Sequence, residues 1–175
     1  MHAQQAIPKE EEQKPMESLD RIDRQILELL QDDGRLTGAE VGRRVGLSQP
    51  AASARIARLE KAGVISGYRA IVHAGSVGLN IRAVVRLRTT HAQLGPALQL
   101  ASETNEIAST LRVTGEDCLI FDVHCADAAR LERIVDSLAR YGPVTTALVL
   151  REYPAKPLSP VDVDDLAART GSARN

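Results

Sequence analysis

The side chains that could do chemistry in this sequence are few and lie far apart. Cys118 and His124 are the candidate nucleophile and base, but six steps along a strand, at roughly 3.3 Å each, place them about 20 Å apart. Cys118 and Cys125 would point to opposite faces of the same strand, which excludes a disulfide between them. Histidines at metal-ligand spacing and the glycine-rich motifs of nucleotide-binding and hydrolase folds are also missing. We therefore predict that the protein is not an enzyme and uses no metal and no cofactor; an enzyme that reacts through Cys118 or His124 is the alternative.

Positive charge is concentrated in one part of the chain. The formal net charge is -1, so the protein is not basic as a whole. Between residues 34 and 69, however, Glu40 and Glu60 are the only acidic residues, and the basic ones are Arg35, Arg43, Arg44, Arg55, Arg58, Lys61 and Arg69. Such a local basic patch is typical of a surface that contacts DNA phosphates.

Three short helices are predicted around this patch. The first carries apolar residues at helical spacing from Leu19 to Leu30, with Asp20 as its cap, and stops at Gly34. The second begins after Thr37 and ends at Gly46. The third is capped by Ser48, has Pro50 in its first turn and buries Ala52, Ile56 and Leu59 before Gly63.

The second and third helices have the pattern of a helix-turn-helix. This motif needs a small residue where the helices approach and a glycine in the turn, and Gly42 and Gly46 supply them. The third helix then presents arginine and glutamine, which can hydrogen-bond base edges, whereas Ser48 and Arg44 are better placed for phosphates. The predicted DNA-binding residues are Arg43, Arg44, Ser48, Gln49, Pro50, Ser53, Ala54, Arg55 and Arg58. A small helical bundle with a solvated basic face is the alternative.

The rest of the chain changes from helical to mixed patterns. Short strands are predicted at residues 64–65 and 68–72 around Gly67, which makes the first domain winged-helix-like, and glycines mark a linker at 74–81. Beyond it, segments 82–90, 107–114, 119–125 and 144–153 read as strands, and 92–103 and 127–140 as helices. The order βαββαβ predicts a ferredoxin-like domain and an α+β protein overall.

One face of the predicted sheet lacks a cover. The helix-facing set is Ala83, Val85, Leu87, Leu119, Phe121 and Val123, whereas the opposite face mixes apolar Val84 and Ile120 with Arg86, Asp122 and His124. A half-apolar face on a small domain favours a partner sheet, so we predict a homodimer. Arg82, Arg86 and Arg112 are interpreted as solvated or interface residues rather than ligand clamps.

The helical segment LDRIDRQILELLQDDGRLTGAEVGRRVGLSQPAASARIARLEKAGVISGY closely resembles the DNA-binding head of the Lrp/AsnC family, the feast/famine regulators. The resemblance covers nearly all of residues 19–153. It implies a transcriptional regulator that binds double-stranded DNA and whose dimers assemble into higher oligomers, commonly octamers. It also implies a small-molecule effector, often an amino acid, bound between dimers.

Two loops of the second domain are candidates for the effector site. Glycine in the turn at residues 113–118 would let backbone N–H groups approach a carboxylate, and the turn resembles the family's VxGxxD loop. Cys118 stands where relatives often have an acidic residue, and the loop before the last strand resembles a second family loop. The predicted effector-binding residues are Thr114, Gly115, Glu116, Asp117, Cys118, Tyr141 and Gly142. A plain hairpin turn is the alternative.

Domain boundaries follow from these patterns. We expect a disordered tail at 1–17, a DNA-binding domain at 18–73, a linker at 74–81, an effector-binding and oligomerisation domain at 82–153 and a flexible tail at 154–175. The sequence has no signal-peptide pattern and no apolar run near the ~20 residues that span a bilayer, so we expect a cytoplasmic protein that does not enter a membrane. An architectural protein that organises DNA without sensing an effector is the second alternative.

Overall fold

The computed structural model describes residues 19–158, so the predicted tail at 1–17 and residues 159–175 of the predicted tail at 154–175 lie outside them. The chain divides into two compact units. The helical unit contains residues 19–69 and 155–158 of the described chain, and the sheet unit contains residues 70–154. None of the described helices is long and apolar enough to cross a membrane.

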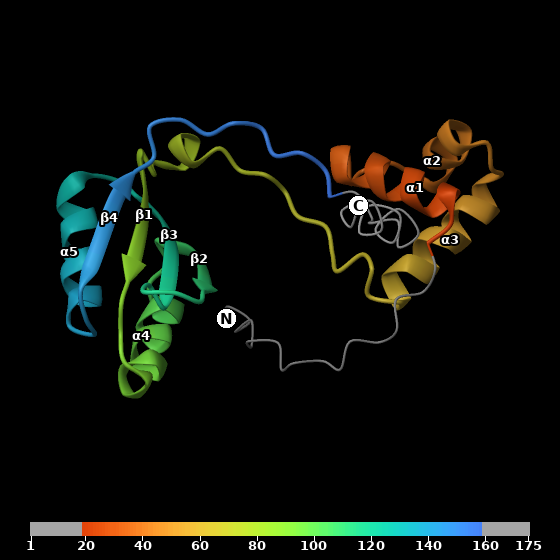
Figure 1. The fold of residues 1–175 in the computed structure, drawn as a ribbon. Coiled ribbons are helices and arrows are strands. Elements are labelled where there is room, and N and C mark those ends of the chain that lie inside the picture. The colour runs from red at the N-terminus through yellow and green to blue at the C-terminus, as the bar shows by residue number, and fades with distance from the viewer. Residues whose placement is uncertain (1–18, 159–175) are drawn as a thin grey trace, which may run out of the picture. The chain divides into compact units, whose positions relative to one another are not determined.

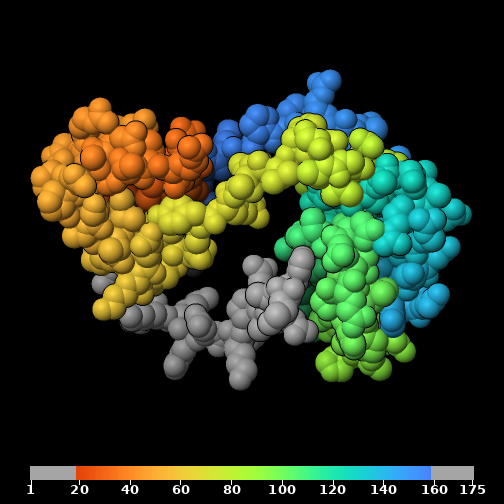
Figure 2. Space-filling model, turned by 180° about the vertical axis from the view of Figure 1, so that it is seen from behind, coloured from red at the N-terminus to blue at the C-terminus, as the bar shows by residue number. Residues whose placement is uncertain are grey.

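The helical unit consists of three helices around a small apolar core (orange in Figures 1 and 2). They are α1 (Arg21–Asp32), α2 (Gly38–Val45) and α3 (Gln49–Lys61). Capping boxes at Asp20 and Thr37 begin the first two helices, because each cap side chain accepts an N–H bond three residues later. Ser48 stands at the cap position of α3, but its side chain makes no capping bond, contrary to the prediction; Pro50 in the first turn leaves one fewer N–H to satisfy.

No strand forms at 64–65 or 68–72, so the predicted wing strands are wrong for the described chain. The backbone N–H groups of Val64 and Ile65 both donate to the Leu59 carbonyl, at 2.9 and 3.2 Å, and thereby close the end of α3. The Tyr68 hydroxyl donates to Glu60 at 2.9 Å. Beyond Gly67 the chain reaches a short 3-10 helix at Ala74–Val77, within the predicted linker.

The sheet unit has the predicted order β1 (Ile81–Leu87), α4 (His91–Glu103), β2 (Ile107–Arg112), β3 (Leu119–Cys125), α5 (Ala128–Ala139) and β4 (Val144–Leu148). The strands lie in the order β2-β3-β1-β4 and all pairs are antiparallel. Figure 1 shows α4 and α5 on the same side of the sheet. This arrangement confirms the ferredoxin-like fold.

The alternation along the strands places the core as predicted. All six residues of the predicted helix-facing set are fully buried, and Cys125 joins them. The predicted last strand is too long, because β4 ends at Leu148. Its partner β1 begins at Ile81, so only Val149 finds one more backbone partner, the Arg82 carbonyl at 2.9 Å. Likewise β1 ends at Leu87 rather than at Thr90, which stands at the cap position of α4.

Candidate functional site

The turn between α2 and α3 has the geometry of a helix-turn-helix. Gly46 has a left-handed backbone (φ 74°) and ends α2, and the Leu47 N–H donates to the Gly42 carbonyl at 2.8 Å. A Cβ at Gly42 would lie 2.7 Å from the Leu47 carbonyl oxygen, so only glycine fits there without a shift of the turn. The structure therefore confirms both glycine roles that were predicted from the sequence.

In the amino-terminal half of α3, the side chains that point away from the core are open to solvent. A Cβ at Gly38 would lie 2.1 Å from the Ser53 Oγ, so α2 approaches α3 closely beside this face. A helix start presented in this way can enter a major groove. The predicted contact residues that are exposed are Arg43, Arg44, Ser48, Gln49, Pro50, Ser53 and Ala54.

Unlike the other predicted DNA contacts, Arg55 and Arg58 form ion pairs with Asp20 and Asp23. Arg55 Nη1 bonds both Asp20 and Asp23, the latter at 2.9 Å, and Arg58 Nη2 bonds Asp23 at 2.6 Å. Their side chains are 32% and 39% exposed, whereas that of Asp23 is 1% exposed. The sequence predicted only a capping role at this end of α1. The matching i, i+3 spacing of the two acids and the two arginines is the signal that could have revealed this cluster.

Hydrogen bonds bias the charge states of these groups. The Asp23 N–H, and after it the Arg55 guanidinium, holds the pKa of Asp20 below its ordinary value. The bonds to Asp20 and Asp23 raise the pKa of Arg55. Arg55 is therefore a cation whose charge is matched by carboxylates of α1.

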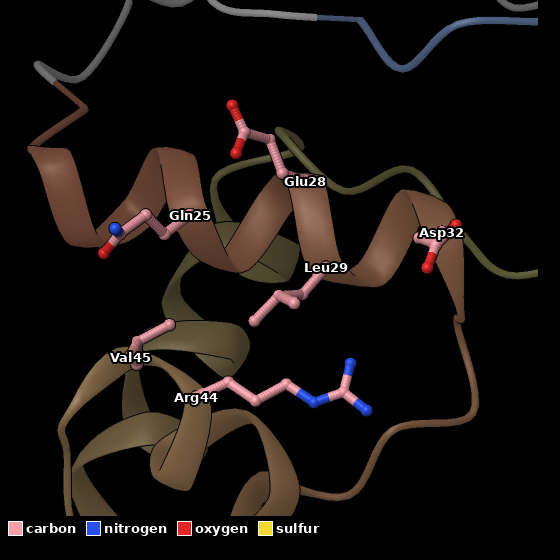
Figure 3. Close-up of a pocket in the computed structure, with 6 residues that line it drawn as sticks. All are labelled: Gln25, Glu28, Leu29, Asp32, Arg44 and Val45. Atoms are coloured by element: carbon pink, nitrogen blue, oxygen red, sulfur yellow. The ribbon is translucent and has the colours of Figure 1, made fainter.

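A hollow of about 290 Å³ lies between α1 and α2 (Figure 3). Its walls are Gln25, Glu28, Leu29 and Asp32 of α1, with Arg44 and Val45 of α2. Figure 3 shows Arg44 extending beneath Leu29 toward the Asp32 end of α1. Carboxylates thus share the rim of this hollow with Arg44, a predicted phosphate contact.

Three loops of the sheet unit meet at the carboxyl end of β1. The Cys118 N–H donates to the Leu87 carbonyl at 2.9 Å, and its thiol donates to the Thr89 carbonyl at 3.2 Å. The Thr89 hydroxyl donates to the Tyr141 carbonyl at 2.6 Å. A Cβ at Gly142 would lie 2.2 Å from the Arg88 carbonyl oxygen. The structure therefore brings Cys118, Tyr141 and Gly142 together.

The other predicted effector residues form the tip of the β2–β3 hairpin. Val113 N–H donates to the Cys118 carbonyl at 3.1 Å and closes the turn. Thr114, Gly115 and Glu116 are exposed, and nothing lies near a Cβ built at Gly115. Asp117 is 3.6 Å from Arg86, so its carboxylate already has a cationic neighbour. These four residues adjoin the meeting point of the loops but do not enclose it in this single chain.

Two family patterns match the chain, one on each unit. The winged helix-turn-helix DNA-binding pattern matches residues 19–66. The Lrp/AsnC ligand binding domain matches residues 82–158. The chain belongs to the Lrp/AsnC family. It is thus a helix-turn-helix transcriptional regulator with a ligand-binding domain, as the sequence resemblance implied.

Sequence relatives of this Lrp/AsnC chain are also regulators. An uncharacterized HTH-type transcriptional regulator of Bacillus subtilis, YezC, is 32% identical over 139 residues, which is 79% of this chain and 99% of the relative. The leucine-responsive regulatory protein of Rhizobium meliloti is 47% identical over 73 residues, but this match spans 42% of this chain and only 47% of that relative.

Solved structures agree with the fold. LrpC of Bacillus subtilis has a TM-score of 0.75 and 26% identity, covering 80% of this chain and all of LrpC. A transcriptional regulator of Neisseria meningitidis, solved as a complex with L-methionine, has a TM-score of 0.74 and 28% identity, covering 82% of this chain and 97% of its own.

The open sheet face of this Lrp/AsnC chain carries an ion-pair network. Arg82 bonds Asp122 through Nε and Nη2, both at 2.8 Å, and its Nη1 lies 2.8 Å from Glu152. His124 Nε2 lies 3.4 Å from Asp122, and strand register pairs His124 with Arg82. Cys118 lies beyond Leu119, whose strand partner is Leu87 at the other end of β1, so the Cys118–His124 pair of the enzyme alternative does not form.

The Arg82–Asp122 pair predicts an acid sensitivity. The Arg82 guanidinium holds the pKa of Asp122 below its ordinary value of 3.8. Because the folded pKa is lowered, the stabilisation is fully present above pH 3.8 and is lost as pH falls through the folded value. Urea unfolding followed by circular dichroism should therefore show a steeper stability loss below pH 4 for wild type than for Asp122→Asn. Identical pH slopes for the two chains would contradict this role.

Proposed function

We propose that this regulator recognises specific DNA sequences by placing the amino-terminal half of α3 in the major groove. The observation that carries the proposal is the exposed start of α3, held by the Gly42–Gly46 turn. Gln49 and Ser53 would contact base edges, and Arg43, Arg44 and Ser48 would contact phosphates. Pro50 and Ala54 would border the bases, whereas Arg55 and Arg58, which pair with Asp20 and Asp23, lie on the side of α3 turned toward α1.

A phosphate role for Arg44 can be measured through salt. Arg44→Ala should weaken binding to every duplex and lower the slope of log affinity against log salt by about 0.9, because one fewer counterion is released. Fluorescence anisotropy at several salt concentrations measures this slope. Arg133→Ala removes the same charge from an exposed position on α5 and serves as the matched control. Equal slopes for wild type and Arg44→Ala would rule out the phosphate contact.

We propose further that the chain forms a homodimer through the open sheet face, and that dimers assemble into a higher oligomer such as an octamer. Half-buried Val84 and Ile120 lie on this face beside Leu111, which is 57% exposed. Their apolar area favours a partner sheet. Leu111→Asp should shift the sedimentation coefficient toward the single chain, and an unchanged coefficient would exclude this face.

The proposed effector is an amino acid that binds near Thr114–Cys118 and Tyr141–Gly142. Its binding would modulate DNA binding or assembly, and the protein would act in the cytoplasm. The L-methionine complex of the Neisseria meningitidis regulator supports this class of ligand. In this chain the Cys118 thiol already donates to Thr89, so Glu116 is the exposed carboxylate available to an amino group.

Anisotropy titrations with and without each amino acid test the function as a whole. The DNA is a duplex that wild type enriches from a random library, and the control is its scrambled version. Preference for the enriched duplex that shifts with one amino acid is the expected result. Preference without any shift would contradict the effector, and equal binding to both duplexes would favour an architectural protein.

A further inference from the structure

Asp23 is the one charged side chain that is buried among residues 19–158. A buried carboxylate is unfavourable unless hydrogen bonds and opposite charges compensate it. Asp23 Oδ2 accepts from the Asp20 N–H at 3.2 Å and from Arg58 Nη2 at 2.6 Å, and its Oδ1 accepts from Arg55 Nη1 at 2.9 Å. Two of these three donors belong to α3. Asp23 therefore joins the start of α1 directly to α3.

The two arginines restrict how α3 can lie against α1. Arg55 and Arg58 are three residues apart and so lie on one side of the helix, almost a full turn from each other. Contacts at two levels oppose both rotation of α3 about its axis and sliding along it. The apolar contacts of Ala52 and Leu59 in the same core are less directional. The ion pairs thus fix the rotation and position of α3 against α1, which apolar packing alone does not determine.

Rotation of α3 matters for reading DNA. At about 100° per residue, Ser53 lies roughly 160° around the helix from Arg55, on the opposite side. Side-chain tips lie about 5–6 Å from a helix axis, so a 20° rotation moves them by about 2 Å. A functional group must be held within about 0.5 Å and 10–20° to keep its geometry. A small rotation therefore breaks base contacts made by Gln49 and Ser53.

We propose that Asp23 is a positioning residue for sequence recognition, which acts by holding Arg55 and Arg58 and thereby sets the rotation of α3. This inference rests on the proposed reading of DNA by α3. The two arginines are matched in charge by Asp20 and Asp23, so they serve orientation rather than base contact. Asp23 itself never touches DNA.

Asp23→Asn tests this role, because it keeps the shape of the side chain and removes its charge. The variant should bind the scrambled duplex as well as wild type or better, since the arginines lose part of their compensation. Its preference for the enriched duplex over the scrambled one should fall at least tenfold. Anisotropy on both duplexes at fixed salt, with circular dichroism to measure the folded fraction, gives both values.

Each other outcome overturns the proposal. A preference that is kept or increased would mean that Arg58, once released, reads bases itself. A loss that is equal on both duplexes and follows the folded fraction would mean that Asp23 only stabilises the fold. A wild-type chain that enriches no duplex would contradict the proposed function, and this inference with it.

A second variant covers the case in which Asp23→Asn does not fold. The triple change Asp23→Leu, Arg55→Leu and Arg58→Met replaces the whole cluster by apolar side chains, a substitution that buried ion-pair triads can tolerate without loss of stability. This chain should fold and bind the scrambled duplex, yet lose preference for the enriched one. Full preference in the folded triple variant would overturn the positioning role.

Discussion

Gly142→Ala should lower the free energy of unfolding of the sheet unit by about 3 kcal/mol. Gly142 has φ 148°, which side-chain-bearing residues rarely adopt, and a Cβ there would lie 2.2 Å from the Arg88 carbonyl oxygen. Since the Cβ is attached rigidly to the backbone and its neighbour is a backbone carbonyl, the clash is relieved only by moving the Gly142 loop or the loop that follows β1. Urea denaturation followed by circular dichroism measures the loss.

Gly115→Ala is the matched control for Gly142→Ala. Gly115 also has a positive φ, 112°, but a Cβ there would meet open space. The control should therefore show backbone strain alone, about 1–2 kcal/mol. Equal losses for the two variants would show that the contact with Arg88 adds nothing, and would contradict the close approach of these loops.

Gly42→Ala should reduce affinity for the enriched duplex by about 100-fold, which is close to 2.7 kcal/mol. The added Cβ would lie 2.7 Å from the Leu47 carbonyl oxygen and 3.3 Å from that of Ser48. The turn must shift, and α3 with it, so the base-reading residues lose their place. Anisotropy on the enriched duplex measures the change.

Gly95→Ala provides the comparison for Gly42→Ala. Gly95 lies inside α4 with nothing near a Cβ, so this change should stabilise the chain by about 0.5–1 kcal/mol and leave DNA binding unchanged. Wild-type affinity in the Gly42→Ala chain would show that the turn tolerates a side chain. That result would contradict a role of the α2–α3 turn in DNA binding.

The helices and strands of this protein are determined largely by residues close together in the sequence, so the sequence predicts them well. Capping residues such as Asp20 and Thr37 act within one turn, so the starts of α1 and α2 follow from them. Alternation along β3 predicts its buried side, with Phe121 at 0% exposure. The βαββαβ order follows from the same two periodicities.

Features that depend on distant partners were not predictable in the same way. The end of β4 is set by where β1 begins, and residues 64–72 form no strand because nothing in the described chain pairs with them. The bonds of Arg55 and Arg58 to Asp23 join positions 32 and 35 residues apart. Sequence spacing shows that Arg55 and Arg58 share a face, but not which group that face meets.

Base reading by α3 is the central claim, and selection from a random DNA library tests it most directly. Wild type and Gln49→Ala would be selected at the same salt concentration and the enriched duplexes sequenced. Wild type should enrich one motif with two symmetric half-sites, as a dimer requires. Gln49→Ala should lose preference at one position in each half-site, a change of about 1–3 kcal/mol. The same motif from both chains, or no motif from wild type, would contradict the claim.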